Sequence, residues 1–161
     1  MSNIFDKFDK QVNTEELSKQ VKEAAQNASY EDTPAGSYEA KIEHMEIGMT
    51  KDQRPMFKVQ MRLKKGLGET EAAYVAKYKK APCVFMNRVI FGTKNDANMI
   101  ASLMGWLNST KIYEEALVFT SYGELADLVL DMAEDAQGLT FEIEYDESNF
   151  NSISIVDTFD D

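Results

Sequence analysis

The sequence of 161 residues predicts a mainly β fold with helices, and three observations support this prediction. Every second residue is apolar over 56–63, which is the period of a half-buried strand. Apolar residues recur at helical spacing over 96–107 and again over 122–137. These two helices separate three predicted strands from two later ones. Five strands with two helices between the third and the fourth predict an OB-like barrel, with a sandwich or an open sheet as the alternatives.

The other strands are predicted from alternation and from turn residues. The first covers 37–50, and its apolar residues change face near Glu43, which predicts a β-bulge. The third covers 83–91 and is apolar on both faces, as expected of a central strand. The last two cover 139–145 and 150–159 and form a hairpin.

The chain divides into three parts. Residues 1–32 are predicted to form an N-terminal helical extension, because 14–28 carries a thin, alanine-rich apolar stripe. The run Asp-Thr-Pro-Ala-Gly at 32–36 is a strong turn signal, so we place the OB-like domain at 33–156. Residues 157–161 are predicted to form an acidic C-terminal tip.

Composition argues against several kinds of site. Cys83 is the only cysteine and His44 the only histidine, so we expect no intramolecular disulfide, no structural zinc and no histidine-based triad. No apolar run approaches the roughly 18 residues that a membrane span requires, and the first ten residues do not resemble a signal peptide. We therefore expect a cytoplasmic protein without membrane association, metal or cofactor.

Positive charge is concentrated in residues 51–94. This stretch has eleven Lys or Arg residues and three acidic ones, whereas residues 1–50 have five and ten. Residues 95–161 have one basic and fifteen acidic residues, and the whole chain carries a formal charge of −11. A basic stretch within an acidic protein indicates a polyanionic ligand. A surface kept soluble by Lys and Arg is the alternative interpretation.

The predicted second strand presents Lys58, Gln60 and Arg62 on one face, at intervals of about 6.6–7 Å. This row can follow an extended phosphodiester backbone. The segment 69–80, which fits either a helical turn or a mobile loop, adds Tyr74 and Tyr78 as candidates for base stacking. The candidate DNA-binding residues are Arg54, Lys58, Gln60, Arg62, Lys64, Lys65, Tyr74, Lys77, Tyr78, Lys79, Lys80 and Arg88.

The acidic tail is a second candidate site. Its candidate partner-binding residues are Asp157, Phe159, Asp160 and Asp161. An acidic tip with an aromatic residue can bind a basic, apolar pocket of a partner protein, or fold back into the protein's own groove and compete with DNA. A charged terminus without a role is the alternative. The sequence leaves the oligomeric state open, and a homo-oligomer is one option.

Catalysis is the third interpretation considered for the sequence. Asp127, Asp131, Glu134 and Asp135 lie on one predicted helix, and Glu142, Glu144 and Asp146 alternate on one strand. Paired carboxylates can hold Mg²⁺ for nuclease activity, and Glu39-Ala-Lys41 matches a short nuclease element. Because these acidic residues lie on polar faces opposite apolar stripes, solvation explains them. We expect no enzymatic activity.

Two segments carry a resemblance to a known family. Thr-Pro-Ala-Gly-Ser-Tyr-Glu-Ala-Lys-Ile at 33–42 and Arg-Pro-Met-Phe-Lys-Val-Gln-Met-Arg-Leu at 54–63 resemble the start of the core in small phage single-stranded-DNA-binding proteins. The resemblance covers residues 33–110, and it implies a phage protein of the host cytoplasm that acts in replication or recombination. The acidic end is similar to the tips of such proteins, but no Gly/Pro/Gln linker precedes it and Phe159 is not the last residue.

These observations predict a protein that coats single-stranded DNA without strong sequence preference in phage replication or recombination. Replication or recombination proteins could bind its acidic C-terminus. The alternative is an acidic interaction module, or a nucleic-acid mimic, that binds a recombination or host defence protein through residues 95–161.

Overall fold

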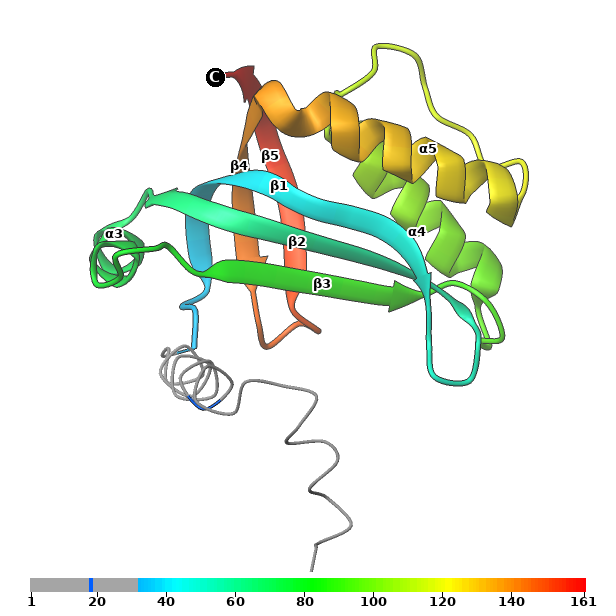
Figure 1. Ribbon diagram of the computed structural model, residues 1–161, viewed down its shortest axis with the longest axis horizontal. Coiled ribbons are helices and arrows are strands. Elements are labelled where there is room, and N and C mark those ends of the chain that lie inside the picture. The colour runs from blue at the N-terminus through cyan, green and yellow to red at the C-terminus, as the bar shows by residue number, and fades with distance from the viewer. Residues whose placement is uncertain (1–17, 19–31) are drawn as a thin grey trace, which may run out of the picture. The chain divides into compact units, whose positions relative to one another are not determined.

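The computed structural model describes Ser18 and residues 32–161, and Thr33–Asp161 form one compact unit (Figure 1). Apart from Ser18, the predicted N-terminal helix lies outside the described residues.

One five-stranded antiparallel sheet organises this unit. The strands are β1 (Gly36–Met49), β2 (Pro55–Gly66), β3 (Cys83–Val89), β4 (Leu139–Asp146) and β5 (Ser152–Asp160). Their order in the sheet is β3-β2-β1-β4-β5, and every neighbouring pair is antiparallel. The predicted number of strands and the two helices between the third and the fourth are confirmed. The sheet is open, with β3 and β5 at its edges, and not closed into a barrel.

β1 belongs to both halves of the sheet because it bends. Its first residues, Gly36–Ala40, pair with β4, while Tyr38–Met49 pair with β2. The register with β2 shifts between Ile42 and His44, so the predicted bulge near Glu43 is confirmed. A bulge turns a strand and increases its twist, and β2–β3 accordingly run across the direction of β4–β5 in Figure 1.

The prediction that 83–91 forms a central strand was wrong. β3 is an edge strand, and its side chains alternate between the core and the outer surface. Val84 and Met86 are buried, whereas Phe85 is 52 % exposed. An exposed phenylalanine made the run apolar on both faces, although only one face is buried.

Within residues 32–161, three helices accompany the sheet: α3 (Glu69–Ala76), α4 (Asp96–Ser109) and α5 (Tyr122–Asp135), the last followed by a 3-10 turn at Ala136–Gly138. The ambiguous segment 69–80 is therefore helical over its first eight residues. The hydroxyl of Ser121 accepts a hydrogen bond from Glu124 N at 3.1 Å and caps α5. None of the helices described in residues 32–161 is both long and apolar enough to cross a bilayer.

The core lies between the inner surface of the sheet and the two longer helices. Phe57 and Met61 of β2 belong to the same core cluster as Leu107 of α4 and Val129 of α5, and all four are almost fully buried. Each such side chain contributes about 1.5–3 kcal/mol by leaving water. The outward side chains of the strands thus remain as the surface on which a ligand can bind.

A side chain of α4 reaches into the gap between β3 and β5. Trp106 Nε1 donates to the carbonyl of Ile153 in β5 at 2.8 Å. The backbone N–H of Ile153 donates to the sulfur of Met86 in β3 at 3.4 Å. Side chains therefore satisfy backbone atoms of β5 that face away from β4, where strand pairing would otherwise be needed.

Candidate nucleic-acid interface

The outward side chains of β2, β3 and the second half of β1 form one surface, which we call the Phe85 face. Across β2 and β3 the opposite pairs are Lys58 with Asn87, Gln60 with Phe85, and Arg62 with Cys83. His44 and Glu46 of β1 lie beside Gln60 and Lys58. The structure thus brings together the three β2 residues that the sequence predicts as a row. The Phe85 face comprises His44, Glu46, Lys58, Gln60, Arg62, Cys83, Phe85 and Asn87.

Phe85 lies in the middle of this face and was not among the predicted site residues. Its side chain is 52 % exposed and faces Gln60 across the strands. The Gln60 amide donates to the Cys83 sulfur at 3.3 Å, which fixes the surroundings of the ring. A flat apolar ring within a polar surface is a platform on which a base can stack. Asn87 is polar and lies two residues after Phe85, so the two side chains share one face of β3. This polar residue was the sequence signal that the face points outward.

Arg62 is held by an acidic residue of β1. Its Nε and Nη2 donate to the two carboxylate oxygens of Glu43 at 2.5 and 2.8 Å, and its Nη1 donates to the carbonyl of Ala81 at 2.6 Å. The hydrogen bonds from Arg62 are the main cause of a lowered pKa for the Glu43 carboxyl. A phosphate that approaches Arg62 must therefore compete with Glu43 for the guanidinium.

The structure does not place Tyr74 where a base could stack on it. Its side chain is only 3 % exposed, and its hydroxyl forms a hydrogen bond with the Thr33 hydroxyl at 3.0 Å. The ring of Tyr78 meets the Tyr74 ring edge-on at a centroid distance of 5.4 Å and packs against the core. The prediction that a base stacks on Tyr74 is therefore corrected, whereas Tyr78 is only half-buried and stays a candidate.

The predicted lysines divide into two groups. Lys77, Lys79 and Lys80 are exposed in the connection from α3 to β3. The charge of Lys80 contributes to the lowered pKa of Glu43, so this connection extends positive charge from the Arg62 end of the Phe85 face. Lys65 is exposed near the end of β2.

Lys64 takes part in a cluster at the end of β5 instead. Its Nζ donates to the Thr140 hydroxyl at 3.1 Å and lies 3.7 Å from a carboxylate oxygen of Asp161. Lys41 also donates to Asp161, and this bond is the main cause of the lowered pKa of that carboxyl. Two of the basic residues in this part of the sheet are thus engaged by the C-terminal residue.

The C-terminal residues do not form a separate tip within the structure. Asp157, Phe159 and Asp160 lie in β5, opposite Glu142, Thr140 and Leu139 of β4. The backbone N–H of Asp161 donates to Gly138 O at 3.1 Å. Phe159 is 37 % exposed, so its ring could still contact a partner.

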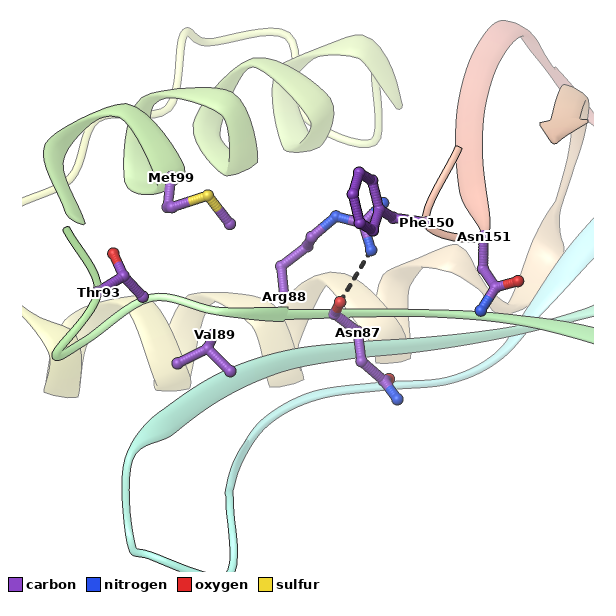
Figure 2. A pocket seen from close by; sticks show the side chains of 7 residues that line it. All are labelled: Asn87, Arg88, Val89, Thr93, Met99, Phe150 and Asn151. Carbon is purple, nitrogen blue, oxygen red and sulfur yellow. Dashed lines mark hydrogen bonds between the residues drawn. The ribbon is translucent and has the colours of Figure 1, made fainter. Parts of the chain in front are cut away.

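Two predicted arginines lie away from the Phe85 face. Arg54 belongs to the turn between β1 and β2, where its Nε lies 2.9 Å from Asp52. Arg88 points to the opposite side of β3, into a hollow beneath the turn between β4 and β5 (Figure 2).

The other half of the outer sheet surface is acidic. Glu142 and Glu144 of β4 are flanked by Glu39 of β1 and by Asp157 of β5. With Asp146 at the end of β4 they form what we call the acidic face. Within residues 32–161, no group of three or more His, Cys, Asp or Glu side chains is arranged to hold a metal ion.

Comparison with known proteins adds no family to this description. The sequence matches no protein-family model and no curated protein. The resemblance to phage single-stranded-DNA-binding proteins stays a prediction.

Proposed function

We propose that the protein binds single-stranded DNA on the Phe85 face, without strong base preference and without catalysis. The observation that carries the proposal is the position of Phe85, an exposed ring with Lys58 and Arg62 on the neighbouring strand. One base stacks on the ring, and the flanking cations contact phosphates on either side. Stacking is tolerant of sequence because every base has a flat π face.

We further propose that the fold is an opened OB-type barrel. The order β3-β2-β1-β4-β5, with α4 and α5 between β3 and β4, is the order that such a barrel would have if it were open between β3 and β5. In OB folds the strand 2–3 surface binds oligonucleotides, and the Phe85 face occupies the corresponding position.

Acidic residues make the proposed binding selective. Glu43 pairs with Arg62, and Asp161 pairs with Lys41 and lies close to Lys64. A polyanion that makes only charge contacts must therefore compete with these carboxylates for the three cations. A flexible single strand gains stacking on Phe85 as well as phosphate contacts. A duplex, whose bases are already stacked, gains only the phosphate contacts. We therefore expect single strands to bind more tightly than duplex of the same length.

Titration of a fluorescent oligo-dT with the protein, at several salt concentrations, tests the proposal. The affinity should fall linearly on logarithmic axes as salt rises, and a hairpin duplex of equal length should bind more weakly. No binding at low salt, or equal affinity for the duplex, would contradict the proposal. A preparation that cleaves the oligonucleotide in Mg²⁺, with loss of cleavage in Glu39→Ala, would show an enzyme instead.

The acidic face favours a second candidate function, an interaction module that binds a basic protein. Glu39, Glu142, Glu144 and Asp157 lie on three adjacent strands and could imitate a row of phosphates. This candidate predicts a partner that is lost on Glu142→Lys and Glu144→Lys substitution, and no affinity for oligonucleotides. A replication or recombination protein is the kind of partner expected.

A further inference from the structure

A hollow of about 580 Å³ lies between β3, the start of α4 and the turn between β4 and β5 (Figure 2). Arg88 of β3, Met99 of α4, and Phe150 and Asn151 of the turn contribute to its lining. These segments are far apart in the sequence, and no pattern in the sequence brings them together. Its volume is within the range of about 300–1,000 Å³ that is usual for sites of small organic ligands.

Arg88 provides an anion-binding group in this hollow. Its side chain extends from β3 between Met99 and Phe150, and its Nη1 donates to the carbonyl of Asn87 at 2.9 Å. Burial lowers the pKa of its guanidinium. Within residues 32–161, Arg54 and Arg62 each pair with a carboxylate, whereas no carboxylate forms an ion pair with Arg88. A partly buried guanidinium with spare donors is suited to a phosphate or a carboxylate.

Phe150 provides a flat apolar surface at the mouth of the same hollow. Its side chain is 82 % exposed, more than any other large hydrophobic side chain in the described part of the chain. Phe150 and Asn151 both have positive φ, at 56° and 53°, a conformation that residues other than glycine rarely adopt. The Tyr145 hydroxyl donates to the Asn151 side chain at 3.3 Å and helps to hold this turn. The fold thus keeps the ring in solvent beside a guanidinium that forms no ion pair with a carboxylate of residues 32–161.

We propose that this hollow binds one nucleotide of the DNA strand, with the base against Phe150 and Met99 and a phosphate on Arg88. The proposal rests on the proposed function, because the strand must first lie on the Phe85 face. Arg88 favours an anion and Phe150 favours a flat ring, so together they select a ligand in which an anion is joined to a flat ring. The site extends the Phe85 face across the free edge of β3.

Asn87 connects the two sites. It lies opposite Lys58 on the Phe85 face, and it also lines the hollow beside Arg88. Because β3 is an edge strand of the sheet, no further strand of residues 32–161 blocks the path from one site to the other. A strand of DNA that crosses β3 therefore passes from the Phe85 ring to the Phe150 ring.

Trp106 offers a built-in reporter for the hollow. A second, smaller cavity of about 220 Å³ is lined by Arg88, Met99 and Trp106, so it shares two residues with the hollow. Trp106 is the only tryptophan of the chain. A nucleotide that moves Arg88 and Met99 should therefore change the tryptophan emission.

The experiment compares the full-length wild type with Phe150→Ala, using fluorescent oligo-dT of increasing length. Val118→Ala is the matched control, because Val118 is 72 % exposed and lies away from both sites. Phe150→Ala should lower the affinity about 5- to 150-fold for oligonucleotides that span both rings, the effect of one lost stacking contact. The shortest oligonucleotides that bind should show no difference. Arg88→Gln should lower the slope of affinity against salt by about 1.

The outcomes separate the two proposals. Wild-type binding that Phe150→Ala and Arg88→Gln leave unchanged at every length, with an unchanged Trp106 emission on binding, overturns the nucleotide site and leaves the Phe85 face intact. Absence of any wild-type binding overturns both. A loss in Phe150→Ala that grows with length, together with a loss of the Trp106 response, supports the nucleotide site. Phe150 is exposed, so its variant tests the proposal even if Arg88→Gln weakens folding.

Discussion

The Phe85 face and the acidic face share β1 and belong to one sheet, yet they differ in how their charges are balanced. On the Phe85 face, Lys58 and Arg62 stand beside Glu46 and Glu43, and an aromatic ring lies among them. On the acidic face, no cation lies opposite Glu142 or Glu144 on β1 or β5, whereas Glu39 lies opposite Lys65 of β2. The difference indicates that only the first half is suited to an anionic ligand with flat rings.

The separation of the two faces follows from the bend of β1. Residues before the bulge pair with β4 and residues after it pair with β2, so β1 presents Glu39 to one face and His44 and Glu46 to the other. Asp161 lies between the two faces, where it contacts Lys41 and Thr140. Four measurements test whether the two faces differ in this way.

The largest effect is expected for Phe85→Ala. Loss of one stacking contact should weaken binding of oligo-dT about 5- to 150-fold at fixed salt, as measured by fluorescence anisotropy. Val156→Ala is the matched control, because Val156 is 49 % exposed on β5. Both variants should retain the far-UV circular dichroism of the wild type. Equal affinity of Phe85→Ala and the wild type would remove the Phe85 face as the binding site.

Charge reversal on the two faces should give opposite results. Lys58→Glu should weaken binding of every sequence by about tenfold or more, since a charge-assisted hydrogen bond contributes about 1.5–3 kcal/mol. Its salt slope should fall by about 1. Glu144→Lys, on the acidic face, should not weaken binding. Equal losses in both variants would mean that the faces do not differ as proposed.

Removal of the Glu43 carboxylate should strengthen binding. In Glu43→Gln the Arg62 guanidinium no longer pairs with a charge and can meet a phosphate without competition. We expect the affinity to rise about 1.4- to fivefold, which corresponds to an exposed ion pair of roughly 0.2–1 kcal/mol. The double variant Glu43→Gln/Arg62→Gln should show no such gain. A weaker affinity in Glu43→Gln would contradict the competition.

The smallest effect concerns pH. The Arg62 hydrogen bonds hold the pKa of the Glu43 carboxyl below its ordinary value of 4.5 in the folded protein. The ion pair therefore stabilises the fold above pH 4.5, and this contribution is lost as the pH falls through the lower folded pKa. Carboxyl NMR titration should show the lowered pKa in the wild type and a rise in Arg62→Gln. Titration of wild-type Glu43 at 4.5 or above would be inconsistent with the pair.

The sequence predicted the strands and helices because their periodicity is strong and local. The β2 row and the bulge near Glu43 both depend on neighbours within a few residues. The exposure of Phe85 could not be predicted so directly, since a ring at an edge strand and a ring in a core have the same pattern. Asn87 was the one local signal for it.

Contacts between distant residues account for the other errors. Tyr74 has an aromatic ring and was therefore predicted to stack on a base. In the structure α3 packs on the sheet and turns this ring inward, toward Thr33. The pairing of Arg62 with Glu43 joins two strands, and Asp161 reaches Lys41 across 120 residues. The hollow at Arg88 needs β3, α4 and the β4–β5 turn together.

The central claim is that DNA lies across Phe85, and photocrosslinking tests it most directly. An oligo-dT that contains 5-iodo-deoxyuridine would be irradiated with the full-length protein, digested with trypsin and analysed by mass spectrometry. Cleavage after Lys80 and Arg88 isolates Phe85 on the peptide Ala81–Arg88. The account predicts an adduct on this peptide, centred on Phe85. Adducts confined to other peptides, with none on Ala81–Arg88, would contradict it.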